Sequence, residues 1–339
     1  MSKTTVGCLT AALVAALIIS IGVNVLQSFA LIGQSMVGLV EPKERLREQV
    51  ELPGKTESQD KIVHIDLEGI ISSMSIGGLL GNAFPMVDTI KESLRQAVED
   101  ANVKAIVLRV NSPGGEVTAS DTIYAAVKEA AKKKPVIVYM DSVAASGGYY
   151  VACGATKVVA SETTLTASIG VIMESFSYHE LFAKVGMESK AFTSGPYKDT
   201  LSGARPMRTD EVIYVQHLVD DMYERFLGIV AEARKVPKDQ LRITVADGRI
   251  VTGRQALAAK LVDQVGYIED AYALARTLGK APGATIVKYR STPSLFSALG
   301  LASAKAAQPQ AKIELNLTSG MLPRLQPGML YYLPSSFAR

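Results

Sequence analysis

The segment Ala105-Ile106-Val107-Leu108-Arg109-Val110-Asn111-Ser112-Pro113-Gly114-Gly115 decides the class of fold. It begins as a nearly continuous apolar run, which is typical of a buried strand, and it ends abruptly at a Pro-Gly-Gly turn. A second buried strand, predicted over 135–140, leads to Ala145-Ser146-Gly147-Gly148. Helical patterns alternate with these strands, so we predict an α/β fold with a largely parallel sheet.

Further elements extend outward from these two strands. Alternating or apolar patterns predict strands over 61–67 and 157–160, and apolar spacings of three and four predict helices over 86–100, 120–133 and 210–234. We therefore expect a catalytic-sized domain over 61–277. The polar stretch 41–60 contains Pro53-Gly54 and is predicted to be a linker. Residues 278–339 are predicted to form a spacer and an apolar tail.

The N-terminus carries no charge between Thr4 and Val40. About 20 apolar residues suffice for a transmembrane helix, so residues 1–40 are predicted to form a signal anchor. Ser28-Phe29-Ala30 offers the alternative of a cleaved signal peptide. With Lys3 and the amino terminus inside the cell, the rest of the chain would lie outside the cytoplasm.

The amino-acid composition argues against several classes of function. The 36 basic and 33 acidic residues give a formal charge of +3, so no basic surface for nucleic acid is implied. Two cysteines, Cys8 and Cys153, exclude a disulfide scaffold, and three histidines leave little material for a metal site. We expect neither a metal nor an organic cofactor.

The two glycine turns follow the carboxyl ends of strands, where α/β sheets bind ligands. Ser146 could present a nucleophilic hydroxyl there, although a helix cap beside tightly packed glycines is the plainer interpretation. A nucleophile needs a base. His64, His179 and His217 do not accompany the turns, whereas Ser194-Gly195-Pro196-Tyr197-Lys198-Asp199 offers a lysine that burial would leave as a free amine.

Four motifs together resemble the SppA signal peptide peptidases, also called protease IV, in their short single-repeat bacterial form. They are Arg109 to Gly115, Ala144 to Tyr150, Thr166 to Val171 and Ser194 to Asp199. Asp247-Gly248-Arg249, Thr252 to Ala256 and Leu261 to Asp263 resemble the closing segment of that family. The resemblance covers roughly residues 60–275.

This resemblance implies a ClpP/crotonase-like fold with a Ser-Lys catalytic dyad. Ser146 matches the nucleophile, Lys198 the general base and Ser168 a hydroxyl that orients the lysine. The backbone N–H groups of Gly114 and Gly147 match the oxyanion hole. The implied protein is a bacterial membrane-anchored serine endopeptidase that acts outside the cytoplasm on signal peptide remnants and short apolar peptides. It would form a homo-oligomeric ring, with eight subunits as the family precedent.

Two rival functions fit the same fold. A crotonase-type acyl-CoA enzyme would share the oxyanion hole, but CoA substrates are cytoplasmic. A non-catalytic membrane scaffold would have no need of both Ser146 and Lys198.

The tail leaves a separate question open. Residues 321–334 are strongly apolar, and their prolines prevent a regular helix. This segment either packs on its own domain or lies in an active-site groove as a tethered competitor of the substrate.

Overall fold

The computed structural model of the chain describes residues 46–55, 58–73, 86–290 and 330–332, together with Leu17, residues 19–24 and Gln27. The chain divides into two compact units, Met1–Arg45 and Leu46–Arg339. Leu17, residues 19–24 and Gln27 are helical, and the rest of the predicted anchor lies outside the described residues. Among the described residues, no helix has the length and apolar character needed to cross a membrane.

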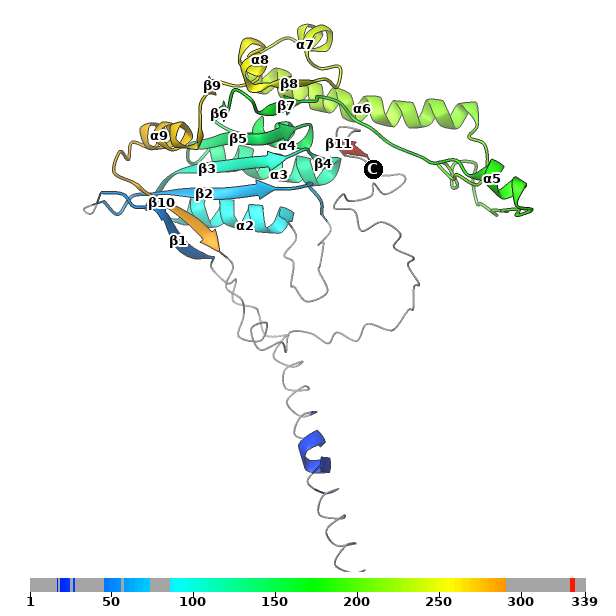
Figure 1. Cartoon of the computed structure of the whole chain (residues 1–339), viewed down its shortest axis with the longest axis horizontal. Helices are drawn as coiled ribbons and strands as arrows, with labels where there is room; N and C mark the ends of the chain where they lie inside the picture. Colours follow the sequence, from blue (N-terminus) through cyan, green and yellow to red (C-terminus); the bar gives the residue numbers. More distant parts are fainter. Residues whose placement is uncertain are drawn as a thin grey trace, which may run out of the picture. The chain divides into compact units, whose positions relative to one another are not determined.

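The second unit is built on one large sheet (Figure 1). Over the described residues this sheet has nine strands, and its main path runs in the order β1 (Arg47–Leu52), β10 (Thr285–Arg290), β2 (Lys61–Glu68), β3 (Val103–Ser112), β5 (Val136–Ala145), β6 (Lys157–Ala160) and β9 (Gln264–Val265). All neighbours from β10 to β9 are parallel, and only β1 on this path is antiparallel. Off this path, β7 (Leu165–Ala167) pairs with β5 and with β8 (Ile250–Thr252). The predicted α/β fold with a largely parallel sheet is confirmed.

Helices cover both faces of the sheet, as buried parallel strands require. Alternate residues of β3 point to opposite faces, so Ile106 and Leu108 belong to one apolar cluster and Ala105 and Val107 to the other. The first cluster is completed by α2 (Met86–Glu99), α3 (Val117–Ala131), α4 (Gly147–Ala152) and α6 (Thr209–Arg234). Helix α9 (Ile268–Leu278) completes the second cluster.

The sheet is wider than the sequence predicts. Strand β1 lies inside the predicted linker, and β10 lies beyond the predicted end of the domain. All six residues of β1 are exposed, so its sequence REQVEL carries no apolar face that would mark it as a strand. Backbone pairing with β10 holds it instead, from Arg47 opposite Arg290 to Leu52 opposite Ile286.

Between β7 and α6 the chain leaves the sheet. We call residues 173–208 the excursion; it contains the short helix α5 (His179–Lys184). Figure 1 shows α5 away from the sheet, with α6 leading the chain back. Apolar side chains of the excursion are exposed, including Phe192 at 89%, Val185 at 61% and Leu181 at 60%. After α6, α7 (Lys238–Thr244) and α8 (Gly253–Ala258) flank β8 along the chain.

Candidate active site

Ser146 is the last residue before α4, at the point where β5 ends. Its side chain is 1% exposed, and its backbone has φ 53° and ψ −114°. Its N–H donates to the carbonyl of Ala167 at 2.7 Å, but its hydroxyl makes no capping hydrogen bond to the helix. A non-glycine residue in this conformation costs roughly 1–3 kcal/mol, and such strain concentrates at functional sites. The sharp strand-to-helix turn is the geometry that exposes a nucleophilic serine.

The two glycine turns meet beside Ser146. A Cβ atom on Gly114 would lie 2.7 Å from the nitrogen of Gly147, and one on Gly147 would lie 3.1 Å from the nitrogen of Gly115. Gly114 also has φ 108°, a conformation that favours glycine. The glycines are tightly packed, as the plainer interpretation holds. The same packing also brings backbone amides together next to the serine, as a catalytic role requires.

The family resemblance assigns the amide of Gly114 to the oxyanion hole, but this N–H points toward the Ser112 side chain. It donates to Ser112 Oγ at 3.1 Å. The next residue, Gly115, belongs to the short strand β4 (Gly115–Glu116), which pairs with the described part of the tail.

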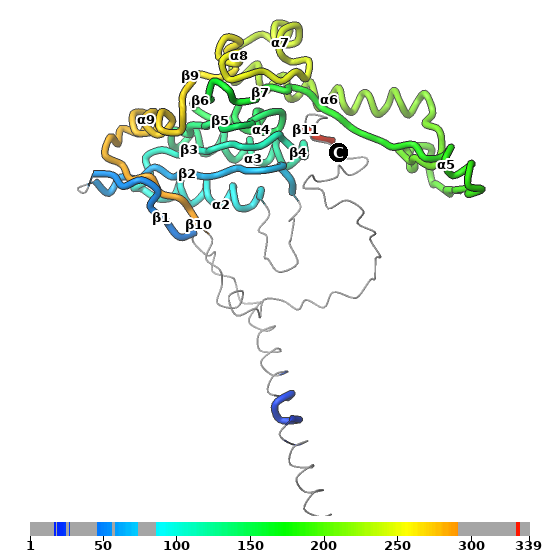
Figure 2. Tube along the Cα trace, viewed as in Figure 1, coloured from blue at the N-terminus to red at the C-terminus, as the bar shows by residue number. Residues whose placement is uncertain are grey.

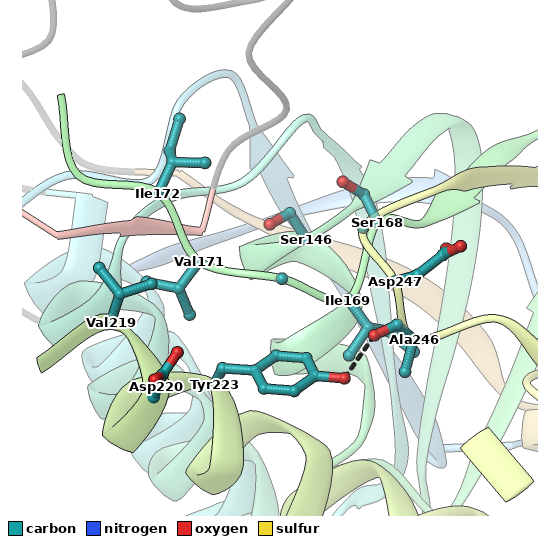
Figure 3. A pocket seen from close by; sticks show the side chains of 12 residues that line it. Ser146, Ser168, Ile169, Val171, Ile172, Val219, Asp220, Tyr223, Ala246 and Asp247 are labelled. Carbon is teal, nitrogen blue, oxygen red and sulfur yellow. Dashed lines mark hydrogen bonds between the residues drawn. The ribbon is translucent and has the colours of Figure 1, made fainter. Parts of the chain in front are cut away.

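A cavity of about 370 Å³ lies at the serine. Ser146 and Ser168 both line it, so the structure brings these two predicted residues together (Figure 3). Ala167 and Ser168 have φ 64° and 50°, and the Ser168 N–H donates to the carbonyl of Arg249 at 2.9 Å. The remaining lining residues are Ile169, Gly170, Val171, Ile172, Val219, Asp220, Tyr223, Ala246, Asp247 and Gly248.

One wall of this cavity comes from the Asp247-Gly248-Arg249 motif, which the sequence marked without giving it a role. The Gly248 N–H donates to the carbonyl of Ile169 at 3.1 Å. Arg249 binds the Asp247 carboxylate through Nε at 2.7 Å, and this hydrogen bond lowers the pKa of Asp247 to about 2. Tyr223 reaches the same wall from α6 and donates its hydroxyl to the carbonyl of Ala246 at 2.5 Å (Figure 3).

Lys198 lies in the excursion, outside the set of residues that line this cavity. It is exposed, and it sits in a turn where its N–H donates to the carbonyl of Gly195 at 3.2 Å. Ser146 and Ser168 thus converge within one chain, and Lys198 does not join them.

An ion-pair network fixes the turn that carries Lys198. Arg205 binds Asp199 with two hydrogen bonds of 2.7 Å and binds Glu211 at 2.8 and 2.5 Å. The Glu211 side chain is fully buried at the start of α6, and its hydrogen bond with Arg205 lowers the pKa of Glu211 to about 2. The backbone next to Lys198 is therefore anchored to the long helix.

None of the three histidines lines the cavity. His64 is buried in β2, where its Nδ1 lies 2.6 Å from the Tyr272 hydroxyl and its Nε2 2.9 Å from Asp66. His179 is half-buried and its Nδ1 lies 2.7 Å from the Ser177 hydroxyl, while His217 is exposed on α6. A histidine base for Ser146 thus has no support within one chain.

The described part of the tail lies between two backbone edges beside the glycine turns, and we call this place the groove. Strand β11 (Tyr331–Tyr332) lies beside β4 (Figure 2). It runs antiparallel to β4, with Tyr332 opposite Gly115 and Tyr331 opposite Glu116. On its other side, Tyr331 exchanges two backbone hydrogen bonds of 3.1 Å with Ile172. The chain thus clamps an extended segment of itself between two backbone edges, one of which also borders the cavity of Ser146.

Tyr332 shows how this groove holds a residue next to the glycine turn. Its carbonyl oxygen lies only 1.9 Å from where a Cβ atom on Gly114 would stand, so this approach requires glycine. Its fully buried ring contacts Tyr150 and Phe226 at centroid distances of 4.8 and 4.7 Å, and its hydroxyl donates to the carbonyl of Met222 at 3.2 Å.

A strained serine beside converging backbone amides, next to a groove that holds an extended peptide, has the architecture of a serine-type peptidase. Comparisons with known proteins agree. The model of Peptidase family S49 matches residues 128–281, and that of Clp protease matches residues 79–168.

Several of the relatives are peptidases by name. A Synechocystis sp. protein named as a protease is 38% identical over 226 residues, which is 67% of this chain and 77% of that one. An Enterococcus faecium protein named as a signal peptide peptidase SppA is 35% identical over 244 residues, 71% of this chain and 70% of that one. Protease 4 of Salmonella typhi is 38% identical over 210 residues, 62% of this chain and 34% of that one.

The chain therefore belongs to peptidase family S49 and is a serine-type peptidase of the SppA type with a ClpP-like α/β fold.

Proposed function

We propose that this protein is a membrane-anchored serine endopeptidase that degrades signal peptide remnants and other short apolar peptides outside the cytoplasm of a bacterium. The observation that carries the proposal is the groove, in which an extended segment with apolar and aromatic side chains lies beside Ser146 and the glycine turns. The uncharged stretch from Thr4 to Val40 supports the anchor.

Ser146 is the nucleophile of the proposed reaction and Lys198 is the general base. The neutral amine of Lys198 takes the proton of the Ser146 hydroxyl as its oxygen attacks the peptide carbonyl. The C–N bond then breaks, the leaving amine takes up the proton, and an acyl-enzyme remains. Lys198 next removes a proton from water, which hydrolyses the ester. Ser168, on the wall of the same cavity, orients the lysine.

Backbone amides stabilise the oxyanion of the tetrahedral intermediate. Gly147 supplies one of them. The sequence assigns the other to Gly114, but that N–H donates to Ser112, so we propose Gly115 for this role. Antiparallel ladders alternate between bonded and non-bonded pairs, and the Val117 N–H donates to the carbonyl of Leu330 at 3.2 Å. Val117 and Leu330 therefore form a bonded pair, Glu116 and Tyr331 a non-bonded pair, and Gly115 and Tyr332 a bonded pair again. In that last pair the Gly115 N–H faces the carbonyl of the residue at the Tyr332 position.

We further propose that the dyad forms between two copies of the chain. Lys198 is exposed and is not among the residues that line the cavity of its own chain, and the excursion that carries it exposes a set of large apolar side chains. Docking the excursion on a neighbour would bury those side chains and desolvate the lysine, which favours the neutral amine that a base requires. A head-to-tail contact of this kind gives a closed ring when the rotation between neighbours closes on itself, and we propose that it does. Eight subunits is the number that the family resemblance implies.

Mixing two inactive variants tests this arrangement. Ser146→Ala and Lys198→Ala proteins are purified separately, partly dissociated, mixed in equal amounts and reassembled. Each contact then has a one-in-two chance of an intact serine and a one-in-two chance of an intact lysine, so about a quarter of the wild-type activity returns. The control is a Ser146→Ala, Lys198→Ala double variant mixed with either single variant. The double variant supplies neither group, so these mixtures should stay inactive. No recovery in any mixture, from variants that assemble normally, would exclude a dyad between chains.

Labelling discriminates the proposal from the two rival functions. A serine-reactive phosphonate labels Ser146 in a peptidase and leaves a non-catalytic scaffold unlabelled. A crotonase-type enzyme would turn over an acyl-CoA thioester and leave apolar peptides intact. Membership of peptidase family S49 favours the peptidase over both.

A further inference from the structure

Glu116 is a buried carboxylate in the wall of the groove. Its side chain is 7% exposed, and it stands at the N-cap position of α3, where a negative charge interacts favourably with the helix dipole. It makes no capping hydrogen bond. Its oxygens instead accept hydrogen bonds from the Ser72 hydroxyl at 2.5 Å and from the Ser73 N–H at 3.0 Å.

These contacts attach residues 71–73 to the outer side of β4. The Ile71 N–H donates to the carbonyl of Gly114, and the Glu116 N–H donates to the carbonyl of Ile71, both at 2.8 Å. Four extended backbone segments therefore lie side by side, in the order Ile71, β4, the tail segment and Ile172. The Glu116 carboxylate is part of this layer, next to the place where the peptide binds.

The register places Glu116 opposite one residue of the bound segment. Tyr331 pairs with Glu116 across the ladder, and both backbone hydrogen bonds of Tyr331 go to Ile172 on the other side. Tyr331 and Glu116 are therefore a non-hydrogen-bonded pair, whose side chains share one face with Cβ atoms about 4.5–5.5 Å apart. Tyr331 is 6% exposed, so this face is largely shielded from water.

We infer that Glu116 sets the side-chain specificity of the peptidase at the Tyr331 position, the residue immediately before the one whose carbonyl meets the glycine turn. A buried carboxylate repels a second carboxylate and attracts a cation or a hydrogen-bond donor. The groove accordingly rejects Asp and Glu at this position and accepts hydroxyl-bearing or basic residues. The inference rests on the proposed peptidase function and on the tail segment as a stand-in for the substrate.

Four fluorogenic peptides test it, of the form acetyl-Leu-X-Tyr-(7-amido-4-methylcoumarin) with X as Asp, Asn, Tyr or Lys, from which cleavage after Tyr releases the fluorescent aminocoumarin. Asp and Asn have nearly the same size and differ in charge, so the ratio of their kcat/KM values isolates the electrostatic effect. For the full-length wild type at pH 7 we expect Asn to be preferred over Asp by at least about tenfold, the effect of like charges at close range in a partly buried site. The tail competes equally with every peptide, so it cancels in the ratio.

Glu116→Gln should bring the Asn-to-Asp ratio close to one while Tyr at X is still cleaved. Ser72→Ala provides a second variant, which weakens the contact with residues 71–73 but keeps the charge, so it should slow all four peptides alike and leave the ratio unchanged. Glu162→Gln removes an exposed carboxylate that pairs with Arg254 and serves as the matched control.

Two results would overturn the inference. One is a wild type that cleaves the Asp and Asn peptides equally well. The other is an unchanged ratio in Glu116→Gln, which would leave Glu116 a purely structural role. Failure of the wild type to cleave any of the four peptides would instead count against the proposed function.

Discussion

The surroundings of Ser146 and of Lys198 differ in almost every physical respect. Ser146 is 1% exposed at the end of a central strand, in a strained conformation that the packed glycine turns maintain. Lys198 is exposed on the excursion, where even Phe192 is 89% exposed. Polar interactions, not apolar packing, hold the turn that carries Lys198. Arg205 ties Asp199 and Glu211 together there.

This difference indicates a division of tasks. In the proposed mechanism the core holds the groups that need sub-ångström precision, namely the proposed nucleophile and the backbone amides, because close packing leaves them no freedom. The excursion carries a long flexible side chain on a locally stiff turn, which suits a group that is delivered to a site on another molecule. The predictions below aim at one region or the other.

Removing either proposed dyad member should have the largest effect. We expect Ser146→Ala and Lys198→Ala each to lower kcat for an apolar peptide by at least about 10³-fold, and the double variant to be no worse, because the two groups act as a unit. Melting temperatures should stay near that of the wild type. Lys190→Ala is the matched control, since Lys190 is another exposed lysine of the excursion. Normal turnover by Lys198→Ala would remove the lysine from the mechanism.

Gly114→Ala should damage the core side of the site next most strongly. The new Cβ atom would stand 2.7 Å from the Gly147 nitrogen and would block the place of the Tyr332 carbonyl. We expect kcat/KM to fall by about 10²-fold, the scale of a lost oxyanion donor. Gly69→Ala has a similar φ of 84° but open space around it, so it controls for backbone strain. Equal losses in both variants would assign the effect to strain alone.

Arg205→Gln should weaken the excursion side while leaving the core intact. It removes the side chain that joins Asp199 to Glu211 and frees the turn that carries Lys198. We expect roughly a tenfold fall in peptide turnover, because a misplaced catalytic group costs rate even when it is present. Phosphonate binding by Ser146 should be retained. Arg254→Gln, which breaks only the exposed pair with Glu162, should have no effect.

Acid should erase the structural contribution of this network. The folded pKa of Glu211 is lowered to about 2 from an ordinary value of 4.5, so its ion pair with Arg205 stabilises the fold fully above the ordinary value. That stabilisation is lost as the pH falls toward about 2. The melting temperature of the wild type should therefore exceed that of Arg205→Gln at pH 7, and the gap should close in strong acid. A gap that persists there would assign the stabilisation to another contact.

The core side of the site was largely readable from the sequence. Apolar runs that end at Pro-Gly-Gly and Ser-Gly-Gly turns mark buried strands and the edge where ligands bind, and the structure brings Ser146, Ser168 and the glycines together at that edge. Local patterns suffice there because strand burial and turn chemistry are properties of neighbouring residues.

The remaining features depend on long-range contacts that no local pattern encodes. Strand β1 has no buried face, so only its pairing with β10 defines it. The motif around Lys198 was recognised, but spacing along the chain could not place the lysine away from its own cavity. The inward turn of the Gly114 amide depends on Ser112, and the position of Tyr332 depends on pairing with residues more than two hundred positions earlier.

Deleting residues 312–339 should have the smallest effect and the opposite sign. In the proposed mechanism Tyr331 and Tyr332 occupy the place of an extended substrate, and a tethered segment would compete at roughly millimolar effective concentration. We expect the truncated protein to cleave short peptides several-fold faster, mainly through a lower apparent KM. Its melting temperature should fall, because the ring of Tyr332 no longer packs on Tyr150 and Phe226. A deletion of residues 333–339 alone keeps both tyrosines and should retain the slower rate. If loss of the whole tail lowers activity together with stability, its role is structural and it does not compete with the substrate.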